Sequence, residues 1–219
     1  MQLYTFWRSQ AAFRVRIALT LKGLEPEMLY VDLIKGEQAA PLYRKLNPAM
    51  LLPALVDGAG PPLVQSLAII EYLEEVYPNP PLLPEHPRDR AHVRAIAHTV
   101  AIDAHPFVVP RVRNYLKREF HADESSEKRW LQHWLDTALG VVEEMLSKDA
   151  RTGQFCFGDA PSLADVCLIP HVTSALMLYS PNFDAYPTVK RIFGGCLQLR
   201  EFVEAHPRNQ TDAPANSGT

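Results

Sequence analysis

The hydrophobic pattern of the chain changes period near its N-terminus. Residues 3–7 are aliphatic, aromatic or β-branched, which is typical of a short buried strand. From Ala11 onward the apolar positions follow a helical spacing, with Val15 and Ala18 on the same face. Ser9 lies at the junction, where a hydroxyl can accept a hydrogen bond from the free amides of a first helical turn. The pattern therefore predicts a strand that leads directly into a helix capped by Ser9.

Strand and helix patterns continue to alternate up to a proline-rich stretch that begins at residue 78. Because a helix separates the first two expected strands, these strands can be parallel through a crossover connection. Pro53 cannot donate to a strand ladder, so we expect it at the first residue of a strand or at a bend. The predicted order is βαβ followed by ββα, with later segments at 28–31 (strand), 37–46 (weak helix or loop), 51–56 and 63–64 (strands joined by a hairpin turn) and a helix from Leu67.

The proline-rich stretch divides the chain. Five of the ten residues from Pro78 to Pro87 are proline, a composition typical of a linker between domains. The remainder follows helical spacing: a segment at 86–120 that Pro106 and Pro110 should break, a helix at 126–146, a buried helix opened by a capping box of Ser162 and Asp165, and helices at 188–194 and 198–205. We predict an α/β domain at 1–80, an all-helical domain at 87–207 and a flexible tail at 208–219.

Composition narrows the class of protein. Of the 219 residues, 47% are hydrophobic and 21% are charged, as in an ordinary soluble globule. The formal net charge of −3 gives no support for binding to nucleic acid or to a membrane. Cys156, Cys167 and Cys196 lie in apolar surroundings, so we expect packing thiols rather than disulfides or a metal site. With neither a signal-peptide pattern nor a membrane-spanning run, we expect a cytoplasmic protein.

Two serines mark predicted helix starts at the end of a strand. The free amides and the dipole at a helix N-terminus favour an anion, and Arg8, Arg14 and Arg16 add positive charge near Ser9. Ser66 repeats the arrangement of Ser9, so two helix N-termini could hold one multiply charged ligand. A plain capping role is the more frequent use of such serines and stays open for both.

Four motifs, in order, are similar to those of the zeta-class glutathione transferases. They are Phe-Trp-Arg-Ser-x-x-x-Phe-Arg-Val-Arg-Ile-Ala-Leu at 6–19, Asn-Pro-x-x-x-x-Pro at 47–53, Gln-Ser-x-Ala-Ile-Ile-Glu-Tyr-Leu-Glu at 65–74 and Gly-Asp-x-x-x-x-Ala-Asp at 158–165. Residues 103–106, with Arg111 after them, are most similar to the bacterial isomerases of that class. The resemblance reaches to about residue 207. It implies a thioredoxin-like N-terminal domain, an all-helical C-terminal domain and a two-fold homodimer.

The resemblance also implies an activity on a small-molecule substrate. This activity is the glutathione-dependent cis–trans isomerisation of a maleyl keto acid, maleylacetoacetate or maleylpyruvate, in aromatic catabolism. Ser9 would be the catalytic residue, because a donor at a helix N-terminus lowers the pKa of the glutathione thiol. The resemblance implies glutathione contacts for Ser9, Gln10, Ala11, Gln38, Leu52 beside a cis Pro53, Gln65, Ser66 and His105, and substrate-carboxylate contacts for Arg8 and Arg111.

Some residues depart from the family pattern and leave alternatives open. Gln10 and Ala11 replace a Ser and a Cys of some zeta members, Val108 and Val109 replace polar residues, and Leu176 stands where an arginine can stand. A more apolar pocket favours an alternative function, a transferase that conjugates or dehalogenates other small electrophiles. A non-catalytic binding module is a third hypothesis, against which Ser9 argues. His105 as an ordinary helix-terminus histidine and Arg111 as a solvated helix charge also stay open.

Overall fold

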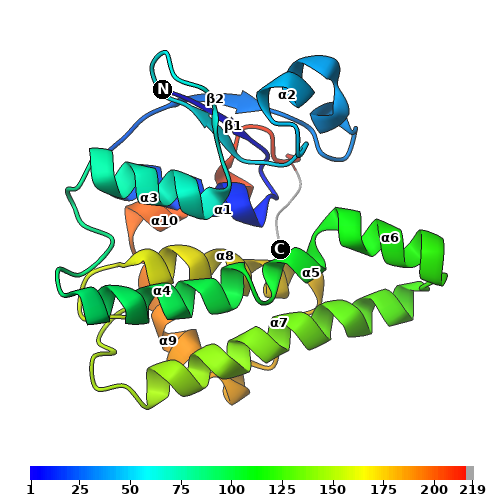
Figure 1. Cartoon of the computed structure of the whole chain (residues 1–219). Coiled ribbons are helices and arrows are strands. Elements are labelled where there is room, and N and C mark those ends of the chain that lie inside the picture. Colours follow the sequence, from blue (N-terminus) through cyan, green and yellow to red (C-terminus); the bar gives the residue numbers. More distant parts are fainter. Residues whose placement is uncertain (216–219) are drawn as a thin grey trace. The chain divides into compact units, whose positions relative to one another are not determined.

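The computed structural model describes residues 1–215, which form two compact units (Figure 1). The first unit consists of Met1–Leu82 together with residues 198–215, and the second unit is Leu83–Leu197. The first unit contains all four strands, and the second is built from helices. The predicted division into an α/β part and a helical part therefore corresponds to the fold, and the boundary lies in the proline-rich stretch.

A mixed four-stranded sheet forms the centre of the first unit. Its strands are β1 (Gln2–Thr5), β2 (Glu27–Tyr30), β3 (Ala54–Val56) and β4 (Leu63–Val64), in the spatial order β2-β1-β3-β4. β1 is parallel to β2, and β3 is antiparallel to both β1 and β4. This is the βαβ–ββα arrangement of a thioredoxin-like domain. The first strand ends at Thr5 instead of the predicted residue 7, although Phe6 and Trp7 remain buried.

Helices α1 (Gln10–Leu21), α3 (Ser66–Val76) and α10 (Arg200–Ala205) pack together in the first unit. They lie on one face of the sheet (Figure 1). A short helix, α2 (Pro41–Leu46), and a 3-10 turn, η1 (Glu37–Ala39), follow β2. α1 is buried over most of its length, and α3 and α10 pack against it. Two of its buried residues are arginines, Arg14 and Arg16, whose polar groups therefore need partners inside the unit.

The C-terminal residues belong to the first unit, which differs from the predicted domain limits of 87–207 and the predicted tail of 208–219. α10 packs against α1, where the Thr20 hydroxyl donates to the Glu201 carbonyl at 3.1 Å. A 3-10 turn, η3 (Pro207–Asn209), follows α10. The helical spacing was correct, but the partner of this helix lies far away in the sequence, so its pattern could not reveal the unit to which it belongs. Residues 216–219 of the predicted tail lie outside the described residues.

The second unit contains the helices predicted from the apolar spacing. They are α4 (Pro87–Ala101), α5 (His105–Val108), α6 (Pro110–Phe120), α7 (Glu124–Ser147), α8 (Leu163–Leu178) and α9 (Pro187–Cys196), with a 3-10 turn, η2 (Phe183–Ala185). The predicted breaks near Pro106 and Pro110 are present. The three cysteines are free and buried, as expected. None of the helices within residues 1–215 is both long enough and apolar enough to cross a membrane.

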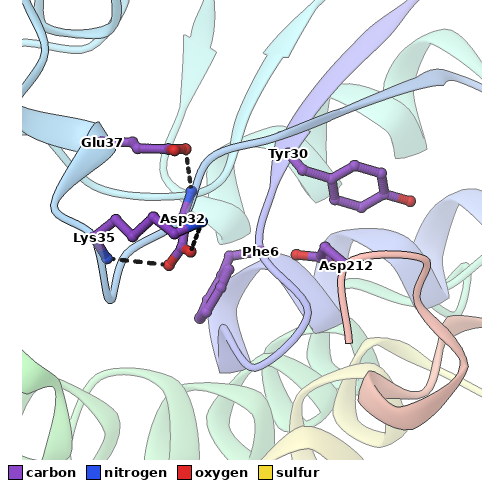
Figure 2. Close-up of a pocket in the computed structure, with 6 residues that line it drawn as sticks. All are labelled: Phe6, Tyr30, Asp32, Lys35, Glu37 and Asp212. Atoms are coloured by element: carbon purple, nitrogen blue, oxygen red, sulfur yellow. Dashed lines mark hydrogen bonds and ion pairs between the residues drawn. The ribbon is translucent and has the colours of Figure 1, made fainter. Parts of the chain in front are cut away.

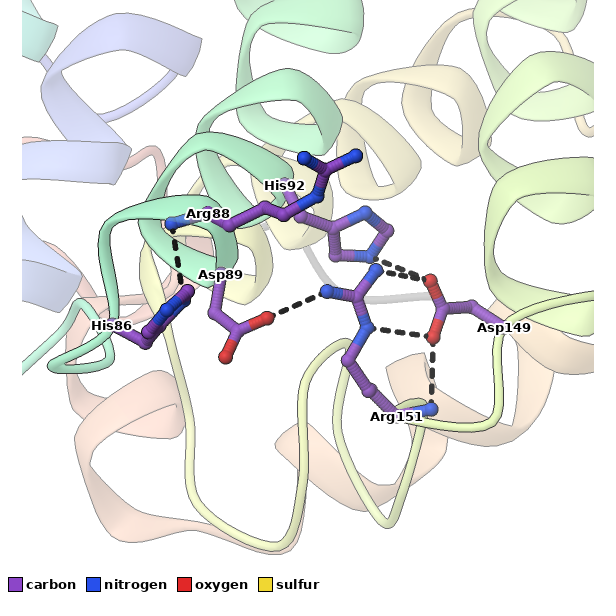
Figure 3. Close-up of polar contacts among 6 residues, drawn as sticks. All are labelled: His86, Arg88, Asp89, His92, Asp149 and Arg151. Atoms are coloured by element: carbon purple, nitrogen blue, oxygen red, sulfur yellow. Dashed lines mark hydrogen bonds and ion pairs between the residues drawn. The ribbon is translucent and has the colours of Figure 1, made fainter.

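A polar cluster joins the start of α4 to the loop after α7 (Figure 3). Arg151 lies 2.6 Å from a carboxylate oxygen of Asp89 and 2.6 Å from one of Asp149, and His92 Nε2 lies 3.3 Å from Asp149. The hydrogen bonds from the Arg151 side chain hold the pKa of Asp149 well below its usual range. The cluster thereby fastens this loop to the first turns of α4.

The predicted capping box opens α8. The buried Asp165 carboxylate accepts hydrogen bonds from the Ser162 amide at 2.8 Å, the Ser162 hydroxyl at 2.8 Å and the Cys156 amide at 2.9 Å. Burial raises the pKa of Asp165, while these hydrogen bonds act in the opposite direction. One side chain thus holds both the start of the central helix and the loop that precedes it.

We expect Asp165→Ala to lower the free energy of unfolding by about 3 kcal/mol, because two buried amide donors lose their acceptor along with the cap. Equilibrium urea unfolding measures this change. Asp123→Ala is the matched control, since Asp123 caps α7 at the surface by accepting from the Ser126 amide at 2.8 Å. Its loss should cost only about 1 kcal/mol. Equal losses in the two variants would contradict the role assigned to Asp165.

Candidate active site

Most of the residues predicted to contact glutathione lie at one edge of the sheet. Tyr4, Ala54 and Val64 pair in one row across the sheet. Because β1 and β4 are both antiparallel to β3, the segments that leave β1 and β4 and the segment that enters β3 lie at the same edge. The predicted residues found on these segments are Ser9, Gln10 and Ala11 after β1, Leu52 before β3, and Gln65 and Ser66 after β4.

Ser9 is the N-cap of α1, as predicted. Its backbone is extended, with φ −70° and ψ 114°, and its Oγ accepts from the Ala12 amide at 3.2 Å. This bond uses a lone pair of the hydroxyl, so the O–H can still donate to a ligand. The helical geometry also leaves the amides of Gln10 and Ala11 without partners in the helix, and these amides favour an anion at the same point. The capping role and a thiolate-binding role are therefore compatible in this geometry.

Gln65 and Ser66 form the second helix start, with a shift from the prediction. Ser66 is the first residue of α3, so the cap position belongs to Gln65. Gln65 is exposed and has φ 72° and ψ 118°, a conformation that costs a residue with a side chain about 1–3 kcal/mol. Such strain persists only where the surroundings impose it, and it concentrates at ligand-binding sites. The backbone at Gln65 therefore independently marks this helix start as a candidate site.

Arg14, one of the three arginines expected to add positive charge near Ser9, connects the two helix starts. It lies on α1, is only 2% exposed, and its Nη1 donates to Ser66 Oγ at 3.3 Å. A buried guanidinium between the two N-termini adds positive potential where each helix dipole already favours an anion. The sequence did contain a signal for the burial of Arg14, because the residues on either side of it in the predicted helix are apolar.

The segment before β3 is held by side chains of α2 and its cap. The Leu51 carbonyl accepts from the Tyr43 hydroxyl at 2.6 Å and from Asn47 Nδ2 at 2.7 Å. Burial raises the pKa of Tyr43 to about 12, so this hydroxyl remains a donor even in moderately alkaline solution. The peptide bond between Leu52 and Pro53 is cis, as the resemblance implied, and both residues are buried. The backbone that would meet an extended peptide is therefore fixed in place.

Gln38 lies in the 3-10 turn η1 and follows Glu37, which lines a pocket of about 270 Å³ (Figure 2). Gln38 is partly buried, and within residues 1–215 its Oε1 has no hydrogen-bond partner. The pocket itself is lined by Phe6, Tyr30, Asp32, Lys35, Glu37 and Asp212. Lys35 pairs with Asp32 at 3.3 Å, and Glu37 accepts from the Asp32 amide at 2.8 Å. With three carboxylates and one ammonium group, this pocket is unfavourable for an anion, unlike the two helix N-termini.

Of the remaining predicted residues, one lies on the segment that leaves β1 and two lie in the helical unit. Arg8 is exposed on the loop after β1, with its guanidinium carbon 5.9 Å from the centre of the Trp7 ring. His105 begins α5 and Arg111 is an exposed residue of the first turn of α6, so both belong to the helical unit. The structure thus groups the predicted glutathione residues of the first unit and leaves the relation of His105 and Arg111 to them as a prediction.

Two tryptophans of α7 fix the bend between α5 and α6. Pro110 starts a new helix, so the Phe107 carbonyl lacks the donor that a continuous helix would supply. Trp130 Nε1 donates to this carbonyl at 2.8 Å, and the Trp134 ring stacks on the Phe107 ring with centroids 4.1 Å apart. The direction in which Arg111 leaves the bend therefore depends on α7, which the sequence pattern did not indicate.

The apolar departures from the family pattern differ in accessibility. Val108 is buried, whereas Val109 is partly exposed and Leu176 on α8 is 40% exposed. Of the three apolar residues that differ from the family pattern, Leu176 and Val109 are therefore exposed enough to contact a ligand. Within residues 1–215, no three side chains of His, Cys, Asp or Glu come together as a metal site would require.

Known proteins with similar sequences identify the family of this chain. The sequence model described as "Glutathione S-transferase, N-terminal domain" matches residues 3–81. A maleylacetoacetate isomerase from Pseudomonas aeruginosa is 43% identical, and the match covers 98% of this chain and 100% of the relative. The similarity therefore extends beyond the N-terminal unit and through the helical one.

Solved structures have the same fold over the same length. The holo structure of a maleyl pyruvate isomerase, described as a bacterial zeta-class glutathione S-transferase, matches with a TM-score of 0.95 and 42% identity, covering 98% of this chain and 100% of that one. A maleylacetoacetate isomerase from Methylobacterium extorquens AM1, with bound malonate and glutathione, matches with a TM-score of 0.95, 47% identity and the same coverage. By full-length sequence identity and by fold, the chain belongs to the zeta class of the glutathione S-transferase family.

Proposed function

We propose that this protein is a glutathione-dependent cis–trans isomerase of a maleyl keto acid, either maleylacetoacetate or maleylpyruvate. The main observation behind this proposal is that two helices begin at one edge of the sheet. Ser9 lies at one of these N-termini and the strained Gln65 at the other. The isomerase relatives extend over the whole chain, and one of them binds a dicarboxylate together with glutathione. The donors at the edge suit a peptide that carries both a thiolate and carboxylates.

The chain's own groups account for glutathione binding in this proposal. Glutathione supplies, when bound, a thiol sulfur that adds reversibly to the maleyl double bond, so that the bond can rotate before the sulfur leaves. The Ser9 hydroxyl and the amides of Gln10 and Ala11 donate toward that sulfur and keep it unprotonated at neutral pH. The remaining roles follow the predicted residues: Leu52 pairs with the peptide backbone, Gln65 and Ser66 hold the γ-glutamyl carboxylate, and Gln38 and His105 donate to or accept from the peptide.

The substrate carboxylates require cations, for which Arg8 and Arg111 are the proposed partners. A guanidinium binds a carboxylate with two parallel hydrogen bonds, which fixes orientation as well as charge. We also propose a two-fold homodimer, on the basis of the family resemblance, and a cytoplasmic location, on the basis of the apolar surroundings of the cysteines and the sequence patterns described above. Sedimentation at the monomer mass would contradict the dimer.

An assay with both maleyl keto acids, with and without glutathione, tests the isomerase function. Turnover that requires glutathione without consuming it supports the proposal.

The exposed Leu176 and the partly exposed Val109 favour a second candidate function, the conjugation or dehalogenation of an apolar electrophile. In that case glutathione would be consumed in proportion to product, and the maleyl keto acids would not react.

We expect Ser9→Ala to lower kcat about 100-fold, because the thiolate loses a preorganised donor. The loss should be partly recovered at higher pH, since removal of the donor raises the pKa of the bound thiol. Steady-state kinetics across pH measure both effects. Ser9→Gly is the matched control, because glycine retains most of the capping contribution but also lacks the hydroxyl. A catalytic role requires similar losses in both variants, and an unchanged rate in either would show that turnover does not depend on the Ser9 hydroxyl.

We expect Gln65→Gly to bind glutathione at least 10-fold more weakly without losing stability, because glycine adopts the positive φ at no steric cost. Isothermal titration calorimetry and thermal unfolding measure the two quantities. Gln65→Ala is the comparison, since it removes the same side-chain amide but retains the strain. It should therefore bind as weakly as the glycine variant and unfold at a lower temperature. Tight binding by both variants would exclude a role for the Gln65 side chain.

We expect Arg111→Ala to raise KM for the maleyl keto acid about 10-fold or more, with glutathione affinity unchanged, because one charge-assisted contact to a carboxylate is lost. Arg118→Ala serves as the control, since Arg118 is an exposed arginine of the same helix and pairs with Glu119. If the two variants behave alike, Arg111 is a solvated helix charge and the carboxylate is held elsewhere.

A further inference from the structure

The C-terminal segment, defined here as residues 200–213, is held within the first unit by specific hydrogen bonds and a ring contact. Gln210 Nε2 donates to the carbonyls of Glu204 at 2.9 Å and His206 at 3.1 Å, and the Ala213 amide donates to the Gln210 carbonyl at 3.0 Å. The His206 ring meets the Phe13 ring edge-on, with centroids 5.8 Å apart. These contacts give the segment a defined path back toward the sheet.

The segment ends against the loop that carries Ser9. Ala213 packs on a buried cluster made of Phe6, Trp7, Val31, Tyr43 and Leu52. One side of this cluster is the loop that follows β1, and another is the residue before the cis proline. The C-terminal segment therefore contacts the loop that carries Ser9 and packs on a cluster that includes Leu52.

Asp212 makes the polar contact between the segment and this loop. Its Oδ2 accepts from the Trp7 amide at 2.8 Å, and its side chain lies near Phe6 in Figure 2. Trp7 is itself buried, so its amide needs this acceptor. Two residues further along the chain is Ser9, whose own amide donates to the Phe6 carbonyl at 3.0 Å. The loop is thus one connected turn in which a shift at Trp7 is passed to Ser9.

Arg16 holds the same loop from the opposite side of the backbone. Its guanidinium donates to the Trp7 carbonyl at 3.1 Å, the Phe6 carbonyl at 3.3 Å and the Thr5 hydroxyl at 3.0 Å. Burial lowers the pKa of Arg16 to about 9, and the Asp212 carboxylate acts against that change. Asp212 therefore contributes both an acceptor for the Trp7 amide and a negative charge that favours the buried guanidinium.

We propose that Asp212 is a positioning residue of the glutathione site. Through the Trp7 amide, the C-terminal segment sets the place of the Ser9 hydroxyl at the start of α1. This inference rests on the proposed function, in which Ser9 binds the thiolate. A displacement of about 1 Å at a catalytic group can cost about 100-fold in rate, so the effect of Asp212 should appear in catalysis more than in the overall binding of glutathione.

The test compares Asp212→Ala and Asp212→Asn with the wild-type protein, all as full-length chains. The alanine variant should have a kcat 10- to 100-fold lower than the wild-type protein and a higher pKa for the thiol of enzyme-bound glutathione. The ultraviolet absorbance of the thiolate, recorded across pH, measures this pKa. Its affinity for glutathione should change less than about threefold, because Gln65 and Ser66 are unaffected. The asparagine variant keeps an oxygen acceptor for the Trp7 amide, so it should recover most of kcat.

Glu204→Gln is the matched control, because it removes a carboxylate of the same segment that pairs with Arg200 at the surface. It should leave kcat and the thiol pKa unchanged. If Asp212→Ala does not fold, Asp212→Ser replaces it, since the serine hydroxyl is too short to reach the Trp7 amide. A folded variant with a wild-type kcat and thiol pKa overturns the inference. Full activity in Ser9→Ala would instead remove the premise that Ser9 binds the thiolate, and a wild-type protein without glutathione-dependent turnover would overturn the proposed function, so these failures are distinguishable.

Discussion

The buried guanidinium of Arg16 is the interaction on which the first unit depends. A charge inside a protein is tolerated only when hydrogen bonds replace its water. Arg16 satisfies this requirement by donating to the Thr5 side chain, the Phe6 and Trp7 carbonyls and the Ala205 carbonyl. These bonds explain why β1 ends at Thr5, since the following carbonyls turn toward α1 instead of extending the strand. They also explain why a helix from the far end of the chain completes this unit.

The candidate site follows from the geometry that this interaction supports. Once the chain turns after β1, α1 starts at the edge where β4 also ends, and two helix N-termini face the same region. Arg14 then links them through Ser66 and adds a second buried cation. The strain at Gln65 and the packing of Leu52 belong to the same edge. Favourable conditions for an anionic peptide are therefore a property of the architecture as a whole, to which the Ser9 hydroxyl adds a further donor.

The helical unit obeys different constraints. Its order comes from helix ends: the capping box at Asp165, the proline breaks that separate α5 from α6, and the Trp130 donor that satisfies the carbonyl exposed by one of those breaks. Variation at exposed positions such as Leu176 leaves these features intact. Exposed positions of the helical unit can therefore change without disturbing the helix ends that order it.

The sequence by itself determined the features that depend on neighbouring residues. The change of period at Ser9, the linker, the helix breaks at Pro106 and Pro110 and the capping box are local, and motif resemblance added the cis proline and the grouping of Ser9 with Gln65. Only the tertiary structure decided which distant groups meet. Arg14 reaches Ser66 across 52 residues and Asp212 reaches Trp7 across 205 residues. Such pairs leave no period or spacing in the chain, because their partners are chosen by packing after the elements have formed.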